Sequence, residues 1–236
     1  MKIRIILVVV ILATSMILFG QSKCPPRNEL YKDSSLTDFV CKLQYAIFKK
    51  NKDFLLSVVD KNVKNGFGGD NGIEAFKEMW KLDSSDSDIW YFLSRVISLG
   101  GTFCDTPSLS CFVLPYVGLI ECLDTLNPYS TMVVTETNVN VREKPDKNSN
   151  IIGQLNYDIV MYDYDKSYFE YEYNEEGIRS NNEQYYMDKE WYYISSLDKK
   201  IGGYVSGEYL WSPIGYRFFL DKIDGNWKII GWFAGD

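Results

Sequence analysis

Residues 133–157, VVTETNVNVREKPDKNSNIIGQLNY, decide how the middle of this chain folds. Val139 and Val141 alternate with polar neighbours, which is the period-two pattern of a half-buried strand. A proline and a run of polar residues interrupt the pattern over 145–150. The pattern resumes over 151–155, where a glycine between apolar residues marks a bend. The stretch therefore predicts two short strands joined by a polar turn.

A second stretch, GGYVSGEYL at 202–210, completes the pattern of one small domain. Together with VNVR at 139–142, Pro145 and IIGQL at 151–155, it resembles the bacterial SH3 (SH3b) domain. The resemblance implies an SH3b-like β-barrel over residues 131–212 that acts as a binding module. SH3b domains in similar proteins bind cell-wall peptide or another protein.

The same resemblance implies where a ligand would bind. The groove would lie between the loop after Arg142 and the strand WYYI at 191–194. The ligand-binding residues that it implies are Tyr157, Tyr162, Trp191, Tyr193 and Arg142.

A long insertion at 163–190 separates two strands that are close in sequence in a compact SH3b domain. It is rich in tyrosine and holds nine acids and three bases, a local charge of −6. Alternation over 168–173 predicts a protruding hairpin. Tyrosine is enriched at interfaces, so this hairpin could bind a partner, and a solvated hairpin with paired aromatic rings is the alternative.

Composition bounds the function. The chain has 236 residues, 46% of them hydrophobic, which is enough for a sizeable core. It contains no histidine, which excludes Ser-His-Asp and Cys-His catalysis and histidine-ligated metal sites. The net charge of −7 argues against nucleic acid as a partner and disfavours adhesion to anionic lipid. We therefore expect no catalytic residue, no metal and no cofactor.

Residues 1–20 have the pattern of a secretory signal. Lys2 and Arg4 precede an apolar run, and Gly20 is a small residue near which cleavage is expected. The mature chain would be exported to the periplasm or the cell exterior and would have no stable membrane span. A retained membrane anchor is the alternative, because the run is long for a signal.

Export would expose the five cysteines to an oxidising compartment. Cys104 and Cys111 flank a short proline-containing segment, so they are the candidate disulfide, and two unpaired thiols are the alternative. The odd total leaves at least one thiol without a partner inside the chain.

Residues 28–130 predict a mainly helical α+β module. Helices are expected from Ser34 or Ser35 to residue 47, over 54–59, over 73–80 and over 86–99. FVLPYV at 112–117 is expected to be an edge strand because of its proline. Two strands at 216–220 and 227–233, joined by Asp224-Gly225, form a hairpin that could pack on this module.

This module carries two further resemblances. FGGDNG at 67–72, Trp90 and LGGTF at 99–103 are similar to an uncharacterised family of envelope proteins that also carry an SH3b domain. The order of helices and strands, ending in the hairpin at 213–236, resembles the cone-shaped fold of the nuclear-transport-factor superfamily. That resemblance implies that 213–236 completes the N-terminal module.

The expected fold class is therefore α+β, and the expected function is non-catalytic binding of cell-wall peptide or an envelope protein. Two alternatives remain. A cavity in the N-terminal module could bind a small ligand or use Asp70 and Glu74 as hydrolytic carboxylates. Alternatively, the protein could be a protein–protein adaptor that binds its partner through the acidic hairpin at 163–190.

Overall fold

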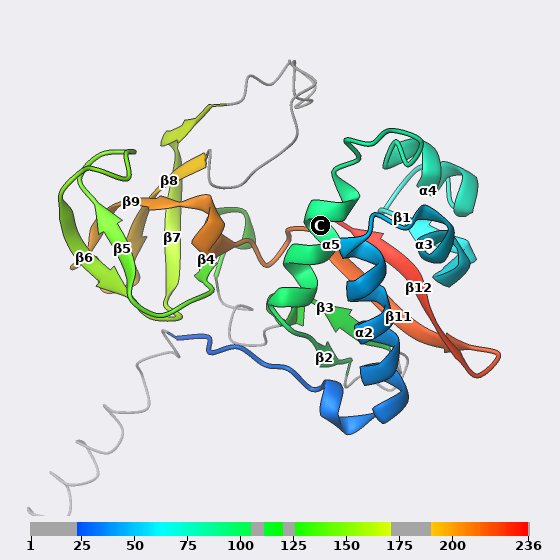
Figure 1. Ribbon diagram of the computed structural model, residues 1–236. Coiled ribbons are helices and arrows are strands. Elements are labelled where there is room, and N and C mark those ends of the chain that lie inside the picture. The colour runs from blue at the N-terminus through cyan, green and yellow to red at the C-terminus, as the bar shows by residue number, and fades with distance from the viewer. Residues whose placement is uncertain (1–22, 105–110, 120–125, 171–189, 236) are drawn as a thin grey trace, which may run out of the picture.

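The computed structural model describes residues 23–104, 111–119, 126–170 and 190–235. They form a mixed α+β protein with two sheets, each in its own module (Figure 1). This confirms the expected α+β class. We call residues 34–114 with 217–233 the N-terminal module, and residues 131–211 the curved-sheet module. Within the described residues, no helix is both long and apolar enough to cross a membrane.

The helices of the N-terminal module follow the apolar periodicity of the sequence. The structure has α2 at Ser34–Phe48, α3 at Lys52–Val58, α4 at Ile73–Met79 and α5 at Ile89–Ser98, after a short 3-10 turn, η1, at Leu30–Lys32. The N-cap of α2 is Asp33 rather than a serine, because its carboxylate accepts hydrogen bonds from the backbone N–H groups of Ser35 and Leu36.

The sheet of the N-terminal module contains strands from both halves of the chain. Its order is β1-β12-β11-β3-β2, where β1–β12 is the parallel pair. The strand bounds are β1 Val59–Asn65, β2 Thr102–Phe103, β3 Phe112–Leu114, β11 Arg217–Ile223 and β12 Asn226–Phe233. The expected hairpin turn is present, with positive φ at Asp224 (50°) and Gly225 (78°). The C-terminal hairpin therefore lies in the middle of a sheet that begins near residue 59.

The prediction of an edge strand over 112–117 is wrong. β3 pairs with β11 on one side and with β2 on the other, so it is an interior strand. Pro115 follows the last residue of the strand, after a cis peptide bond, and therefore removes no hydrogen bond from the sheet. The proline ends the strand instead of marking a sheet edge.

The second sheet has the order β10-β4-β7-β8-β9-β5-β6. Its strands are β4 Thr131–Val134, β5 Val139–Arg142, β6 Ile151–Leu155, β7 Ile159–Phe169, β8 Glu190–Ser196, β9 Gly202–Ser206 and β10 Leu210–Trp211, with η6 (Gly207–Tyr209) before β10. A flat sheet would hold its outer strands about 29 Å apart. All seven strands nevertheless contribute to one core cluster, so the sheet curls around it.

The predicted pair of strands in 133–157 is present as β5 and β6, and β5 shows the expected alternation of buried and half-buried residues. The described ends of the insertion also pair, since Tyr168 lies opposite Trp191 and Phe169 opposite Glu190. The tip of the predicted hairpin, residues 171–189, lies outside the described residues.

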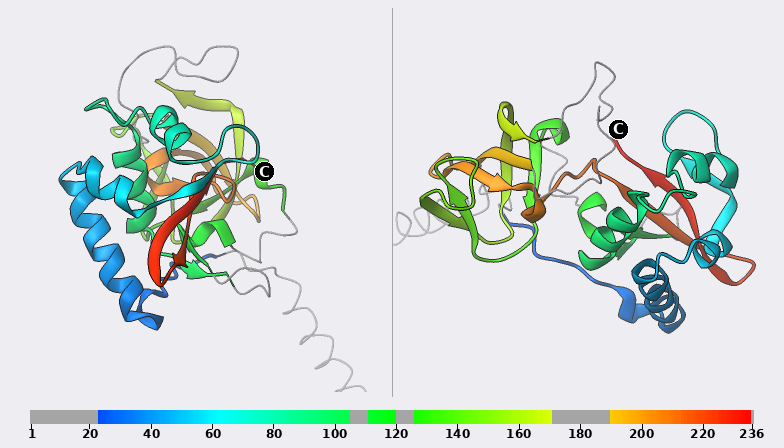
Figure 2. Two further views of the ribbon diagram at one scale, coloured as in Figure 1. Left: turned by 90° about the vertical axis from the view of Figure 1, so that its right-hand side faces the viewer. Right: turned by 45° about the horizontal axis from the view of Figure 1, so that its top comes forward.

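The two modules share a junction (Figure 2). Val133, Ile159 and Trp211 of the curved-sheet module belong to the core cluster of the N-terminal module. Residues 23–29 run along this junction: the backbone N–H of Cys24 donates to Tyr157 O at 2.6 Å, and the hydroxyl of Tyr116 donates to Cys24 O at 3.0 Å. Residues 23–29 therefore form a strap that joins the modules.

Candidate functional site

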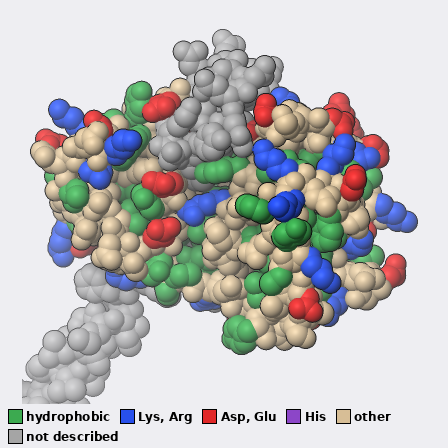
Figure 3. Space-filling view, viewed as in Figure 1, with side chains coloured by type: hydrophobic (Ala, Val, Ile, Leu, Met, Phe, Trp, Pro, Cys, Tyr) green, Lys and Arg blue, Asp and Glu red, His purple; other side chains and the backbone are tan. Residues whose placement is uncertain are grey.

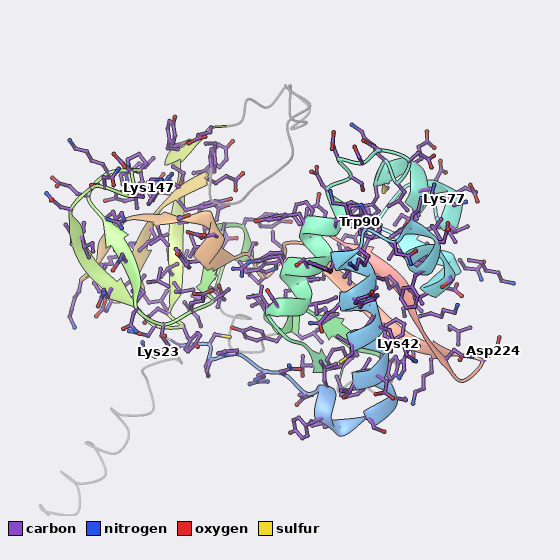
Figure 4. The ribbon with its side chains drawn as sticks, in the orientation of Figure 1. Lys23, Lys42, Lys77, Trp90, Lys147 and Asp224 are labelled. Carbon is purple, nitrogen blue, oxygen red and sulfur yellow. The ribbon has the colours of Figure 1, made fainter. Side chains whose placement is uncertain are left out.

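A groove of about 740 Å³ opens on the curved-sheet module. The turn before β5, the loop after β5, the described ends of the insertion, and η6 contribute to its walls (Lys147 of the loop is labelled in Figure 4). Its lining residues are Glu136, Thr137, Asn138, Val139, Asn140, Arg142, Pro145, Asp146, Lys147, Tyr168, Glu170, Trp191, Ser206, Glu208 and Tyr209.

Three aromatic side chains line the groove. Ile194 points into the core, so the alternation of β8 places Trp191 on the outer face of the sheet. Tyr168 is the cross-strand neighbour of Trp191 and is 49% exposed. Tyr209 in η6 is half-buried, and burial together with hydrogen bonding to Glu208 raises its pKa. The groove thus offers aromatic surface to a ligand.

The loop over 143–150 is braced from within. The Arg142 guanidinium donates to Ser149 O at 2.7 Å, and Ser149 Oγ accepts from the backbone N–H of Lys144 at 3.0 Å. The Asp146 carboxylate accepts from the N–H of Asn148 at 2.8 Å. These bonds hold one wall of the groove in place without a ligand.

The opposite wall is tied to the N-terminal module through Arg95 of α5. Its guanidinium donates to Thr135 Oγ1 at 3.1 Å and to the backbone O of Glu208. Burial lowers the pKa of Arg95, and the carboxylates of Glu136 and Glu208 oppose that shift. The position of η6, which carries Glu208 and Tyr209, therefore depends on a helix of the other module.

The charge of the groove lining is negative. Four carboxylates, Glu136, Asp146, Glu170 and Glu208, face two cations, Arg142 and Lys147, so the lining has a net charge of −2. Aromatic faces and carboxylates both attract cations. This arrangement is suited to binding an extended ligand that carries ammonium or guanidinium groups.

The structure brings together two of the five residues that the SH3b resemblance implies. Trp191 and Arg142 line the groove, whereas Tyr157, Tyr162 and Tyr193 do not. Tyr157 lies in the turn before β7, where its backbone binds the strap residue Cys24. Tyr162 packs on the core and edge-on against Tyr192, with centroids 5.7 Å apart, and burial raises its pKa.

Tyr193 shares the outer face of β8 with Trp191 but makes different contacts. Its ring packs edge-on against Tyr204, with centroids 5.3 Å apart, and Lys166 Nζ lies 5.1 Å from its centroid. Its contacts therefore lie within the sheet surface rather than in the groove.

Sequence reasoning missed most of the groove. Tyr168 falls within the alternating tyrosine pattern of the insertion, and Tyr209 falls within GGYVSGEYL, so both could have been singled out. Glu136 and Glu208 carry no such signal, because the turn after β4 and the position of η6 bring them to the site.

Cys104 and Cys111 face each other as expected for a candidate pair. Their Sγ atoms are 2.7 Å apart, and the N–H of Cys104 donates to Cys111 O at 2.8 Å. Both are buried and both are free thiols in this structure. Hydrogen bonding between them lowers the pKa of Cys104 and raises that of Cys111. Whether they form a disulfide stays a prediction, and Cys122 lies outside the described residues.

The carboxylates of the alternative catalytic site are both on the surface. Asp70 and Glu74 are exposed, and Glu74 pairs with Lys77 at 2.8 Å. The glycine-rich loop before α4 is a structural turn, in which Asn65 Nδ2 donates to the backbone O atoms of Asp70 and Gly72. Among the described residues, no group of three or more Cys, Asp and Glu side chains is placed to hold a metal ion.

Comparisons of the chain with protein-family models, with curated proteins and with solved structures give no match.

Proposed function

We propose that the protein is a non-catalytic, exported binding protein whose curved-sheet module is an SH3b-like domain. Its ligand is an extended peptide that carries cationic groups, either a peptide of the cell wall or a segment of an envelope protein. The observation that carries this proposal is the groove, which combines three aromatic side chains with a surplus of carboxylates.

The aromatic residues supply the contact area. Exposed tyrosine and tryptophan side chains bind with little loss of conformational entropy, because they have few rotatable bonds. Trp191 directly follows the insertion, beside Tyr168, and the braced loop contributes another wall of the groove. A rigid groove with aromatic anchors favours an extended peptide over a globular surface.

The carboxylates supply the selectivity. A ligand ammonium group placed between the Asp146 loop and Glu208 of η6 would be attracted from both walls. An anionic ligand would meet repulsion from the same groups. The proposal therefore favours cationic peptides, and binding is expected to weaken as salt screens these charges.

Retention on insoluble peptidoglycan tests the wall-peptide form of the proposal. We use the chain from Lys23 onward, since both sheets and both core clusters lie within it. Wild-type protein is expected to co-sediment with peptidoglycan, and Trp191→Ala is expected to reduce the affinity at least about tenfold, as for an aromatic hot spot.

Tyr193→Ala is the matched control. It removes an aromatic side chain from the same face of the same strand, but outside the groove. Equal losses for Trp191→Ala and Tyr193→Ala would contradict binding in this groove. If the folded protein is not retained, the wall-peptide form is wrong. Crosslinking in the native envelope then tests whether the ligand is an envelope protein. Loss of the crosslinks with Trp191→Ala supports that ligand, and crosslinks that persist contradict it.

A further inference from the structure

The outer face of α2 exposes large apolar side chains. Cys41, Tyr45 and Phe48 follow one another at helical spacing on the side of α2 opposite its buried residues. Tyr45 is 66% exposed and Phe48 is 78% exposed. We call Cys41, Lys42, Tyr45, Phe48 and Lys49 the α2 stripe.

The inner face of α2 already supplies what the fold requires. Leu36, Val40 and Leu43 are almost fully buried in the core. An outer helix face in water is normally polar, so Tyr45 and Phe48 contribute little to the stability of the isolated protein. Their exposure is better explained by a surface that covers them.

The α2 stripe is basic although the protein is acidic. Residues 39–52 contain four lysines and no acid, in a chain with a net charge of −7. Lys52 pairs with Asp83 at 2.8 Å, and Lys50 donates to Ser85 O at 3.1 Å. In the described part of the chain, Lys42 and Lys49 have no ion pair (Lys42 is labelled on α2 in Figure 4). Asp38, one turn before Lys42, is the exposed acid nearest to the stripe along α2.

The aromatic and basic groups of the stripe lie together. Lys49 Nζ is 5.9 Å from the centroid of Tyr45 and 5.1 Å from that of Phe48. Figure 3 shows hydrophobic and basic side chains side by side over the part of the surface that α2 occupies in Figure 1. Aromatic rings flanked by lysines are the combination that settles at the headgroup level of a bilayer, where the ring is buried and the ammonium group meets phosphate.

We propose that the α2 stripe docks on the surface of an anionic phospholipid bilayer. Tyr45 and Phe48 enter the headgroup region, and Lys42 and Lys49 bind lipid phosphates. Charge complementarity selects this occupant, because the net negative charge of the chain opposes a second copy but does not prevent a local basic face from binding anionic lipid. On this proposal, the α2 stripe is a local exception to the expectation that the overall charge keeps the protein off anionic lipid.

Vesicle co-sedimentation tests the proposal. The probes are phosphatidylcholine vesicles with and without about one third phosphatidylglycerol, and the protein is the chain from Lys23 onward, free of the apolar run at 1–20. Binding is expected with the anionic vesicles and not with the neutral ones. On the bilayer, the two aromatic rings enter the headgroup region and the two lysines meet lipid phosphates. Tyr45→Ser/Phe48→Ser and Lys42→Glu/Lys49→Glu are therefore each expected to lower the affinity for anionic vesicles at least about tenfold.

Tyr129→Ser/Tyr164→Ser is the matched control, because these tyrosines are 60% and 63% exposed but lie off α2: Tyr164 is in β7 of the curved-sheet module, and Tyr129 lies just before β4. It is expected to leave binding unchanged. The proposal is overturned by the absence of binding to anionic vesicles, or by equal loss in the control. It is also overturned if wild-type protein is a dimer in size-exclusion chromatography that Tyr45→Ser/Phe48→Ser converts to a monomer, since a second copy would then cover the stripe.

Discussion

The core of the N-terminal module is rich in aromatic side chains, whereas the core of the curved-sheet module is aliphatic. Phe76, Trp80, Phe92, Phe112 and Phe218 are all buried in the core of the first. The buried core cluster of the second contains only aliphatic side chains and one methionine. Three of its aromatic side chains line the groove, and the buried Trp211 packs into the core of the N-terminal module instead.

This difference distinguishes aromatic residues that stabilise the fold from aromatic residues that are available to a ligand. Trp80 contacts the rings of Phe92, Phe218 and Trp232, with centroids within about 6 Å, so its surface is used by the fold. Trp191 is a similar side chain, but β8 presents it to the groove while Ile194 fills the core. The residue type is the same, and the face on which the strand or helix places it decides what it does.

The largest effect on stability is expected from Phe218→Ala, which removes an aromatic ring of the C-terminal hairpin from the core. Phe218 is fully buried and stacks on Trp80, with the ring centroids 6.1 Å apart. Its removal is expected to lower the free energy of unfolding by about 3–5 kcal/mol. Denaturant unfolding, followed by circular dichroism, measures the change. Phe219→Ala, next to it on the other face and only half-buried, should cost clearly less, and an equal loss would contradict the assignment of Phe218 to the core.

Ile194→Ala is the corresponding change in the aliphatic core. Ile194 is fully buried beneath Trp191 and Tyr193, so the substitution is expected to cost about 2–5 kcal/mol. Retention on peptidoglycan reports on this module, and the helical circular dichroism signal reports on the N-terminal module, which contains α2 to α5. If the modules differ as described, ligand retention is lost with Ile194→Ala at denaturant concentrations that leave the helical circular dichroism signal intact. Simultaneous loss of both signals would show that the two cores unfold as one.

Joining Cys104 to Cys111 is expected to stabilise the N-terminal module alone. Closing a loop of this length contributes about 2–3 kcal/mol by restricting the unfolded chain. Protein oxidised with glutathione disulfide should therefore unfold at higher denaturant concentration than the Cys104→Ser/Cys111→Ser variant. Thiol titration measures whether the pair has closed. An oxidised pair that leaves the unfolding of helices unchanged, or that stabilises the curved sheet instead, would contradict this expectation.

The smallest effect is expected from two surface carboxylates, Asp33 at the N-cap of α2 and Asp198 in the curved-sheet module. Hydrogen bonding from Lys222 holds the pKa of Asp33 well below its usual range, and hydrogen bonding from Ser196 lowers that of Asp198 to about 2. Because both folded pKa values lie below the unfolded value of about 3.9, each group stabilises the protein above about pH 4. That contribution is lost as the pH falls through the folded pKa.

Asp33→Asn and Asp198→Asn should therefore each flatten the fall in thermal midpoint between pH 5 and pH 2. Asn preserves the N-cap of α2 and removes its charge, so an effect of Asp33→Asn isolates the pairing with Lys222. Thermal scans by circular dichroism measure the midpoints. A pH dependence identical to that of wild type in both variants would show that other carboxylates control acid unfolding.

The features that the sequence predicted well are local. The apolar spacing of α2 and α5, the alternation of β5 and the Asp224-Gly225 turn each depend on neighbours within a few residues. The parallel pairing of Val59 with Ile229 could not be derived in this way, because strands distant in sequence leave no periodic signal of their partner. β3 was misjudged because Pro115 looked like part of the strand and lies just past it.

Only part of the candidate site could be predicted from the sequence. Trp191 and Arg142 came from the SH3b resemblance, which fixes positions along strands. Tyr157 and Tyr162, which the same resemblance groups with them, lie outside this groove, Tyr157 in the turn before β7 and Tyr162 against the core. Glu136 and Glu208 meet in the groove only through the curvature of the sheet and the contacts of Arg95.

The position of β12 has a consequence for the order in which the chain can fold during synthesis. The helices and β1 emerge from the ribosome first, but β1 finds its partner only when residues 226–233 have been made. Every strand of the curved sheet, from Thr131 to Trp211, is complete before that point. The module that begins first must therefore finish last, and its apolar helices lack strands β11 and β12 of their sheet while the curved-sheet module is translated.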